Sequence, residues 1–524
     1  MARVWALAGL PETMSNTRTL SLGDRTLVAA IFLVLATFFP YFEDIHSANE
    51  LSRLYLTNAI VSENLVSIDT SLDHLGNIHD KAFRDGRHYS DKAPGVSFFA
   101  VPAAWAYLTL TDLPTLEGEM RLLRLWVSVI PTIFLLMGML RFLQTYIADA
   151  NLRRLLVLGY GLGTLATTYS MLLFGHQLSA VLVFGAFMVA HDAKPDWSTR
   201  RAIIMGVLLA ASLCVEYQNA LFAIPVALFY CTRVRWSPRA ISLALLGAFP
   251  LLAGLGWYHH LAFGGPLTTG YSFLTSSFKE VHEQGVMGIA WPSLDHLVLS
   301  FVDTRKGLLC FAPFLVLAIP GLFLVGRANG AGKLTAVMAG LYALFVISMV
   351  YPDGGWSVSQ RHLTPLVPWL ILPIGLVVQR AVALRPALVG LIALSVLVTG
   401  LSSIVWPHFQ EHLENPFFQM AWPLFEHGWV PPSIFGSMGL SGQTVALLFA
   451  GAVAALLIAD LCVWSTSLWQ CVLSLGVAVI FVIVPLHYAA DWHADQDVQR
   501  DQRFVQSVYE LDEHATPTPF GHTP

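Results

Sequence analysis

The chain has 524 residues, of which 55% are hydrophobic and only 12% are charged, and its mean hydropathy is +0.62. That charged fraction is about half of what a soluble globular protein carries, which excludes an ordinary soluble domain. The net charge of −5 is small and disfavours a nucleic-acid partner. All five cysteines lie in apolar runs without CxxC or Cys/His spacing, which disfavours disulfides and thiolate metal sites.

The apolar runs predict an all-α polytopic membrane protein with about 13 transmembrane helices. These spans cover residues 27–42, 122–141, 155–173, 177–191, 202–217, 219–231, 241–261, 308–326, 334–351, 363–379, 386–406, 443–463 and 469–488. The first run could pass for a signal peptide. However, charged residues follow it in place of a small-residue cleavage site, so we interpret it as an uncleaved span. The expected organisation is a cytoplasmic segment 1–26, a transmembrane domain 27–488 and an extracytoplasmic tail 489–524.

The basic residues support this topology. With the N-terminus in the cytoplasm, 16 of the 29 Lys and Arg residues fall at cytoplasmic span ends. This distribution follows the positive-inside rule. The other basic residues lie outside, mostly in one long loop and the tail.

The first outer loop, residues 43–121, is long enough to predict a functional role. Within it, the sequence Ala48–Glu63 has apolar residues at helical spacing and predicts a helix lying on the membrane. The run Pro94–Leu110 cannot be a full span without inverting every later loop. It therefore predicts an amphipathic or partly re-entrant helix at the outer surface, and a plain second span is the alternative.

Ionisable side chains gather at the outer ends of the predicted spans. They are Glu50, Arg53, Asp91, Lys92, His176, Glu216, His259, His260, Asp303, Arg305, Lys306, Asp353, Arg361 and His362. Such groups are costly at a membrane boundary unless they are paired or bind something. Singly, His176 fits a packing histidine and Glu216 a helix cap, whereas Asp91 and Lys92 could be solvated loop charges. Their shared side predicts one cavity that opens outward.

A polyprenyl phosphate is a ligand that suits carboxylates and cations beside lipid. Its phosphate needs Lys and Arg, most of all when it leaves with developing negative charge. A carboxylate can take the proton of an incoming hydroxyl. Displacement at the anomeric carbon of a sugar requires both groups.

Several short motifs carry a resemblance to a known family. They are ANELSR after the first span, SDKAPG in the same loop, and the later FGGP, RKG and GGWSVSQRHLTPLVP. In these motifs, which span most of residues 27–405, the chain resembles membrane glycosyltransferases of the GT-C class. The resemblance is to the branch with aminoarabinose transferases and protein O-mannosyltransferases (family 39). It implies a polyprenyl-phosphate sugar donor, transfer with inversion on the extracytoplasmic face, and a bacterial inner membrane.

The resemblance also implies roles for particular residues. The acidic pair that follows the first span in the family corresponds here to Asn49 and Glu50, so Glu50 is the expected base and Asp44 the second candidate. The family's acid-lysine-proline element is similar to Asp91-Lys92-Ala93-Pro94, with one residue inserted. Its lysine contacts the donor phosphate, a role expected of Lys92.

Arg305 and Arg361 are expected to share the donor phosphate. Further expected substrate-binding residues are Asp91, Arg53, His176, Glu216, Asp303 and His362. No metal is required, although acids and histidines near the first span could hold a divalent cation. The acceptor, whether glycan, lipid or protein, is left open. The alternative functions are a transporter or flippase and a polymerase or ligase of lipid-linked glycans.

Overall fold

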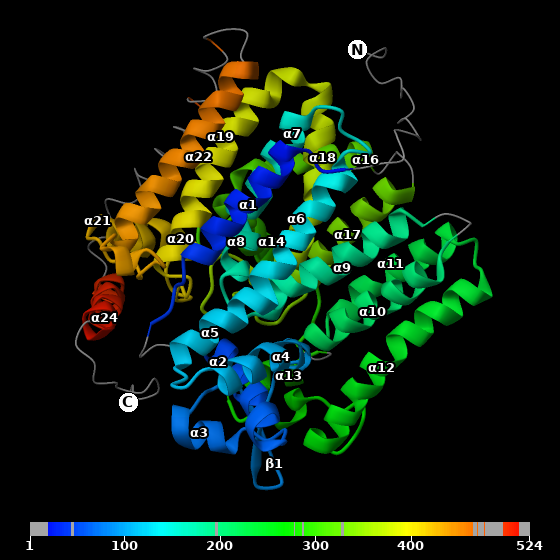
Figure 1. Ribbon diagram of the computed structural model, residues 1–524, viewed down its shortest axis with the longest axis vertical. Coiled ribbons are helices and arrows are strands. Elements are labelled where there is room, and N and C mark those ends of the chain that lie inside the picture. Colours follow the sequence, from blue (N-terminus) through cyan, green and yellow to red (C-terminus); the bar gives the residue numbers. More distant parts are fainter. Residues whose placement is uncertain are drawn as a thin grey trace.

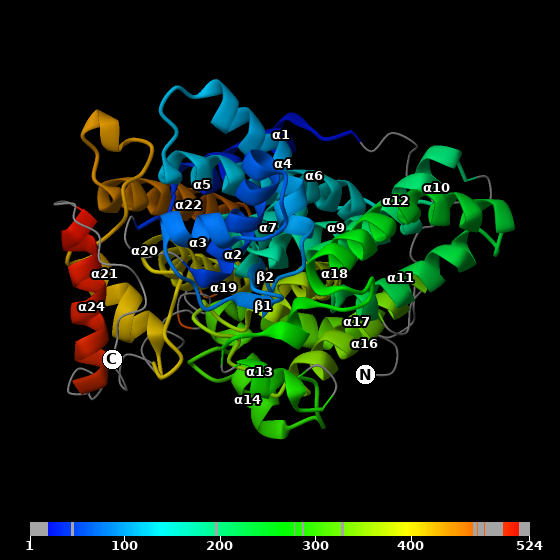
Figure 2. The same cartoon turned by 90° about the horizontal axis from the view of Figure 1, so that it is seen from below.

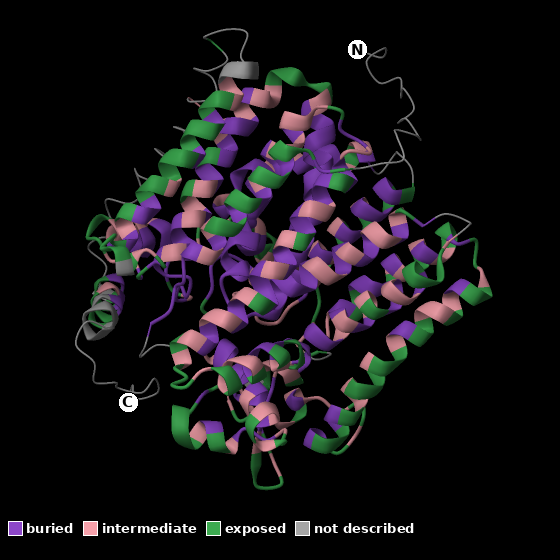
Figure 3. Cartoon of the chain, in the orientation of Figure 1, coloured by how far each residue is buried: buried purple, intermediate pink, exposed green. Residues whose placement is uncertain are grey.

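The computed structural model describes residues 19–42, 47–193, 197–276, 278–285, 288–325, 330–464 and 496–512, together with Trp469 and Gly476. Figure 1 shows a helical bundle above a smaller group of helices and one β-hairpin. In Figure 3 the buried residues concentrate in the middle of the bundle. Figure 1 shows the hairpin and α3 at one end of the molecule, and in Figure 2, which is seen from below, they lie near the middle of the view.

The bundle contains the helices that overlap the predicted spans. These are α1 (Leu22–Thr37), α6 (Ile130–Leu143), α7 (Ala150–Leu162), α8 (Leu165–Ser170), α9 (Gly175–His191), α10 (Thr199–Val215), α11 (Asn219–Arg233), α12 (Pro238–Phe263), α16 (Ala318–Val325), α17 (Gly330–Ile347), α18 (Val367–Arg380), α19 (Arg385–Ser395), α20 (Leu401–Val405) and α22 (Gly442–Trp464). Short turns η4 (Pro313–Leu317), η5 (Arg361–Leu366), η6 (Val382–Leu384) and η7 (Val396–Gly400) join some of them, as does α15 (Leu308–Phe311).

Six described helical segments are long and apolar enough to cross a membrane. They are Leu116–Leu143, Pro238–Phe263, Gly330–Ile347, Arg361–Arg380, Val382–Val405 and Gly442–Leu461. The first twelve predicted spans each overlap a helix or a run of helices, but several of these are short, so the count of 13 stays a prediction. The span predicted at 469–488 lies outside the described ranges.

The prediction of a continuous span at 155–173 is wrong. There α7 ends before Gly163, and Thr164 begins the separate helix α8 by accepting a hydrogen bond from the Ala166 N–H at 3.2 Å. The hydroxyl of Thr164 also donates to the carbonyl of Tyr160 at 2.6 Å, which satisfies one of the free carbonyls at the end of α7.

The closest helix contact, between α10 and α12, depends on glycine. A Cβ at Gly206 would lie 1.7 Å from the Ala244 carbonyl oxygen, and one at Gly247 would lie 2.3 Å from that of Ile203. Small residues allow two membrane helices to approach this closely. The opposite side of α12 has little protein cover (Figure 3), as expected of a helix that faces lipid.

The first loop forms the layer below the bundle. It contains α2 (Ala48–Asn58), η1 (Ala59–Glu63), α3 (Asp69–Leu75), β1 (Lys81–Arg84), β2 (Arg87–Ser90) and α4 (Gly95–Leu110). The next segments, α5 (Leu116–Arg124) and η2 (Leu125–Val129), continue into α6 as one long apolar helical segment. The later segments η3 (Gly270–Phe273), α13 (Phe278–Glu283) and α14 (Leu294–Phe301) follow α12. The strands pair antiparallel across Asp85 and Gly86, which both have positive φ, as in a two-residue hairpin turn.

The helix predicted from the Pro94–Leu110 run is α4, but it is not amphipathic. Its buried face is made of small residues such as Ala100 and Ala104, and its exposed face carries Phe98, Phe99 and Trp105. Both faces are therefore apolar. This pattern fits a helix with protein on one side and lipid on the other.

A separate cluster of buried apolar residues holds the C-terminal helix. It joins η8 (Phe417–Ala421) and α21 (Trp422–Glu426) to the amphipathic helix α24 (Gln496–Asp512) through Val498 and Val505. His412 Nε2 lies 2.6 Å from the Asp501 carboxylate across this contact. The short turn η9 (Gly436–Met438) precedes α22.

Candidate functional site

The β-hairpin brings two acids and a lysine together. Lys81 pairs with Ser90 at the open end of the hairpin, so Asp80 and Asp91, one residue beyond that pair, lie beside each other. The Lys92 ammonium contacts both carboxylates, at 2.9 Å from Asp80 and 3.0 Å from Asp91. The hairpin register thus creates a compact acid-lysine-acid group.

Burial and neighbouring charge give the two acids different properties. Burial raises the pKa of Asp91 above its ordinary value, and the adjacent Asp80 raises it further although Lys92 opposes the change. Burial also acts on Asp80, but there the Lys92 ammonium outweighs it and lowers the pKa. Burial disfavours the charged form of Lys92, yet the two carboxylates raise its pKa. Asp80 is therefore the better ionised acid and Lys92 a permanent cation.

The two acids also differ in their free oxygens. Asp91 uses both carboxylate oxygens, one towards Lys92 and the other as acceptor from the Ser52 hydroxyl at 3.3 Å. Asp80 contacts Lys92 through Oδ2, and no hydrogen bond to Oδ1 is found among the residues that the structure describes. The side chain of Asp80 is 13% exposed and that of Asp91 is 5% exposed. Asp80 is thus the more accessible proton acceptor.

A second buried group joins α2 to the ends of α9 and α10. Arg53 donates to Glu216 at 3.1 Å and to the Asn49 side chain, and His176 Nδ1 lies 3.9 Å from the same Glu216 oxygen. A Cβ at Gly175 would be 2.3 Å from that oxygen, so only glycine allows the carboxylate this position. Arg53 and His176 are 2% and 3% exposed.

Arg361 and His362 complete the cluster from the start of η5. The His362 and His176 rings are 5.0 Å apart, and the Arg361 guanidinium lies over the Phe174 ring at 5.6 Å. Within the described ranges, no hydrogen bond or ion pair reaches that guanidinium, and its Nε is buried without a partner. His176 Nε2 and His362 Nδ1 are buried and unpartnered as well. Buried polar atoms without a protein partner, gathered in one place, suit a site whose ligand exchanges hydrogen bonds with them.

The sequence predicted seven members of this cluster. They are Arg53, Asp91, Lys92, His176, Glu216, Arg361 and His362. Asp80 was not among the predicted site residues. A single acid in a loop does not indicate a site until the register of the hairpin shows which residues lie beside it. Tyr271 was not predicted either. The neighbouring Gly270 packs so tightly on Asp91 that a Cβ would meet the Asp91 Cα at 3.0 Å.

The structure disfavours Glu50 as the base. Its carboxylate accepts two hydrogen bonds from Arg124, at 2.9 and 2.8 Å, and a third from the Leu173 N–H at 2.5 Å. Glu50 is 2% exposed, and burial opposes its ionisation, but Arg124 lowers its pKa. An acid whose oxygens are all engaged in a buried ion pair is a structural group.

The predicted residues Arg305 and Asp303 also lie apart from the cluster. The Arg305 side chain donates to Asp303 at 3.2 Å, and its backbone N–H donates to the same carboxylate at 2.8 Å. Arg305 is thus turned to its own loop, and no contact with Lys92 or Arg361 is found in the described part of the chain. Asp44, the second candidate base, falls outside the described residues.

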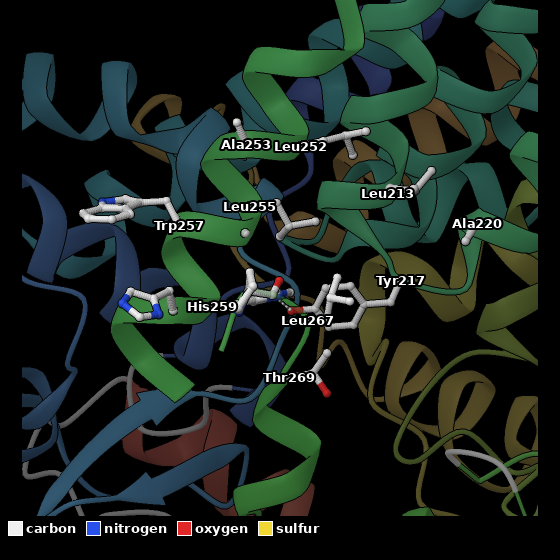
Figure 4. Close-up of a pocket in the computed structure, with 13 residues that line it drawn as sticks. Leu213, Tyr217, Ala220, Leu252, Ala253, Leu255, Trp257, His259, Leu267 and Thr269 are labelled. Carbon is white, nitrogen blue, oxygen red and sulfur yellow. Dashed lines mark hydrogen bonds between the residues drawn. The ribbon is translucent and has the colours of Figure 1, made fainter. Parts of the chain in front are cut away.

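Two cavities adjoin the cluster. The larger, of about 760 Å³, lies between α10 and α12 and has mostly apolar walls, including Leu213, Leu252 and Trp257. Figure 4 shows Tyr217 and His259 at one end of it, joined by a hydrogen bond of 2.8 Å. Tyr217 follows Glu216 directly, so this end of the cavity adjoins the charged cluster.

The smaller cavity, of about 460 Å³, is lined mainly by residues whose side chains carry polar atoms. The lining residues are Leu267, Thr268, Thr269, Tyr271, Ser272, His282 and Glu283. Tyr271 stacks on His282 at 4.4 Å and meets Tyr217 edge-on at 5.9 Å. Leu267 and Thr269 line both cavities, so one loop separates the two cavities.

A divalent cation has no evident site here. Among the residues that the structure describes, no group of three or more His, Cys, Asp or Glu side chains is arranged to hold a metal.

The chain was compared with protein families, with curated proteins and with solved structures. No family model matches the chain, and no curated protein matches it. The structure is similar to that of ArnT from Cupriavidus metallidurans, solved by crystallography in the apo state. The two are 12% identical with a TM-score of 0.46, over 88% of this chain and 76% of that one. Identity this low assigns no role to any residue.

Proposed function

We propose that the protein is an inverting glycosyltransferase that moves a sugar from a polyprenyl phosphate to an acceptor hydroxyl on the extracytoplasmic face. The observation that supports this most directly is the half-buried Arg361 guanidinium, close to His176 and His362, whose Nε is buried and which has no ion-pair partner among the residues that the structure describes. A cation in that state favours an anionic ligand. The distribution of basic loops supports the extracytoplasmic orientation.

The donor would bind across two environments. Its phosphate would contact Arg361 and Lys92, which are the cations best placed to stabilise the departing phosphate. Its prenyl tail would lie in the apolar cavity between α10 and α12, which ends at Tyr217 beside the charged cluster. A cavity of about 760 Å³ is within the size range of small-molecule sites.

The proposed reaction is a single displacement. Asp80 takes the proton from the acceptor hydroxyl through its free Oδ1, and the hydroxyl oxygen forms a bond to the anomeric carbon. The bond from that carbon to the phosphate oxygen breaks, and its electron pair stays on the phosphate. Attack opposite the leaving phosphate inverts the configuration of the sugar.

The other residues hold the two substrates. Arg53, His176 and His362 have buried donor or acceptor atoms without partners, which suits them to the hydroxyl groups of the donor sugar. Asp91 keeps Lys92 in place. The acceptor would enter through the smaller cavity and pass Tyr271 to reach Asp80.

Isothermal titration with a polyprenyl-phosphate sugar tests this phosphate site. Arg361→Ala and Lys92→Met should each weaken binding by about 1.5–3 kcal/mol, the usual loss for a hydrogen bond to a charged group. The matched control is Arg239→Ala, because Arg239 is exposed at the start of α12. Unchanged affinity in both site variants would overturn the assignment.

A further inference from the structure

One buried lysine outside the proposed catalytic group is fully hydrogen-bonded by a single turn. Lys306 is 1% exposed, and its ammonium donates to the carbonyls of Gly355 and Ser357 at 3.0 and 2.9 Å. It lies 3.2 Å from the Ser357 hydroxyl. All three ammonium protons are thus directed to residues 355–357.

The backbone carbonyl of Lys306 makes further hydrogen bonds with the same segment. It accepts hydrogen bonds from the Gln360 N–H and the Ser359 hydroxyl, both at 2.9 Å. The segment needs this support because Gly354, Gly355 and Ser359 all have positive φ, at 69°, 76° and 55°. A non-glycine residue such as Ser359 adopts that conformation only at a cost.

The turn at residues 354–357 lies next to the Arg361 side chain. A Cβ placed on Gly355 would be 3.7 Å from the Arg361 guanidinium, and one on Gly354 would be 3.7 Å from the Arg361 Cγ. The carbonyl of Gly355 is held by Lys306 on the other side. The backbone at residues 354 and 355 therefore lies next to the side chain of the proposed phosphate-binding arginine, and Lys306 holds one carbonyl of that backbone.

We propose that Lys306 is a positioning residue, whose ammonium fixes the 355–357 turn and thereby sets the position of Arg361 for the donor phosphate. The inference rests on the proposed function of Arg361. It adds that donor affinity depends on the charge of a residue that never touches the donor.

The surroundings of Lys306 make that charge sensitive to pH. Burial lowers its pKa to about 7, with Arg361 and Arg305 acting in the same direction and with Glu411 and Asp353 opposing them. A neutral amine has two protons to donate instead of three. Above neutral pH the turn therefore loses one of the three hydrogen bonds that the Lys306 ammonium donates to it.

The experiment compares Lys306→Met and Lys306→Arg with the wild type and with Lys333→Met, whose lysine is exposed on α17. The probe is the monomethyl ester of a short polyprenyl phosphate. This compound is a phosphodiester, so its single negative charge does not titrate near neutral pH. Its affinity is measured from about pH 6 to about pH 8.5, after thermal unfolding shows that each variant is folded.

At pH 6 we expect Lys306→Met to bind the probe about tenfold more weakly than the wild type, the scale of one lost charged contact. The wild-type affinity should fall as the pH rises, whereas Lys306→Arg should bind independently of the Lys306 titration because a guanidinium stays protonated. If Lys306→Met does not fold, the comparison of the two pH profiles decides. Parallel profiles in wild type and Lys306→Arg would overturn the inference.

Arg361→Ala, measured alongside, separates this inference from the proposed function. Loss of binding in Arg361→Ala with full binding in Lys306→Met would refute the positioning role and keep the phosphate site. Full binding in Arg361→Ala would refute the phosphate site itself.

Discussion

The Glu50–Arg124 ion pair gives the clearest prediction about stability, and Glu50→Gln is the variant that tests it. The substitution keeps the size of the side chain but removes its charge. Arg124 is 4% exposed and would retain the Pro40 carbonyl, at 3.1 Å, as a neutral acceptor. Breaking one partner of a buried ion pair costs about 3–5 kcal/mol, because the other charge is left uncompensated.

The free energy of unfolding would be followed in detergent by tryptophan fluorescence against denaturant. Glu117→Gln is the matched control, because Glu117 pairs with Arg121 at 3.0 Å on the surface, where a pair contributes about 0–1 kcal/mol. The double variant Glu50→Leu with Arg124→Met should regain much of the loss, since no charge is then buried unpaired.

Acid should weaken the same pair. Arg124 lowers the pKa of Glu50 in the folded state below its ordinary value of 4.5. The stabilisation is therefore complete above about pH 4.5 and is lost as the pH falls through the lower folded value. Normal stability of Glu50→Gln together with complete loss of transfer would refute this reasoning and restore Glu50 as the base.

Three further predictions concern the proposed site. Asp80→Asn should lower kcat by about 10²–10⁴-fold, the usual contribution of a general base, with donor affinity retained in titration. Ala253→Trp should raise KM for a long-chain donor but not for a short-chain one, because its side chain would fill the apolar cavity; equal effects on both donors would contradict the tail site. Gly175→Ala should lower kcat/KM with normal folding, because its Cβ would displace the Glu216 carboxylate from Arg53.

The sequence contained enough information for the broad arrangement of helices. Apolar runs located a helix at each of the first twelve predicted spans, because membrane spanning requires long apolar stretches whatever the packing. Hydropathy could not reveal the break at Thr164. That break depends on a hydroxyl that caps one helix and closes another, and a threonine inside an apolar run gives no such signal.

The site was predictable where charges were unusual for their surroundings. Asp91, Lys92 and Arg361 stand out because each interrupts or borders an apolar run. Asp80 does not, because its position beside Lys92 arises from strand pairing. Glu50 was assigned to the site from the acidic pair that follows the first span in the family that the chain resembles. In the structure Glu50 pairs with Arg124, whereas Arg53, almost one turn later in α2, pairs with Glu216. The sequence alone gives no signal of which partner each residue takes.

The central claim is transfer of a sugar from a polyprenyl phosphate with Asp80 as the base. The most direct measurement is mass spectrometry of purified protein incubated with total membrane lipid extract, with wild type, Asp80→Asn and Glu50→Gln in parallel. We expect wild type and the folded fraction of Glu50→Gln to release free polyprenyl phosphate. We expect Asp80→Asn to release no polyprenyl phosphate. Release by Asp80→Asn at the wild-type rate would contradict the central claim.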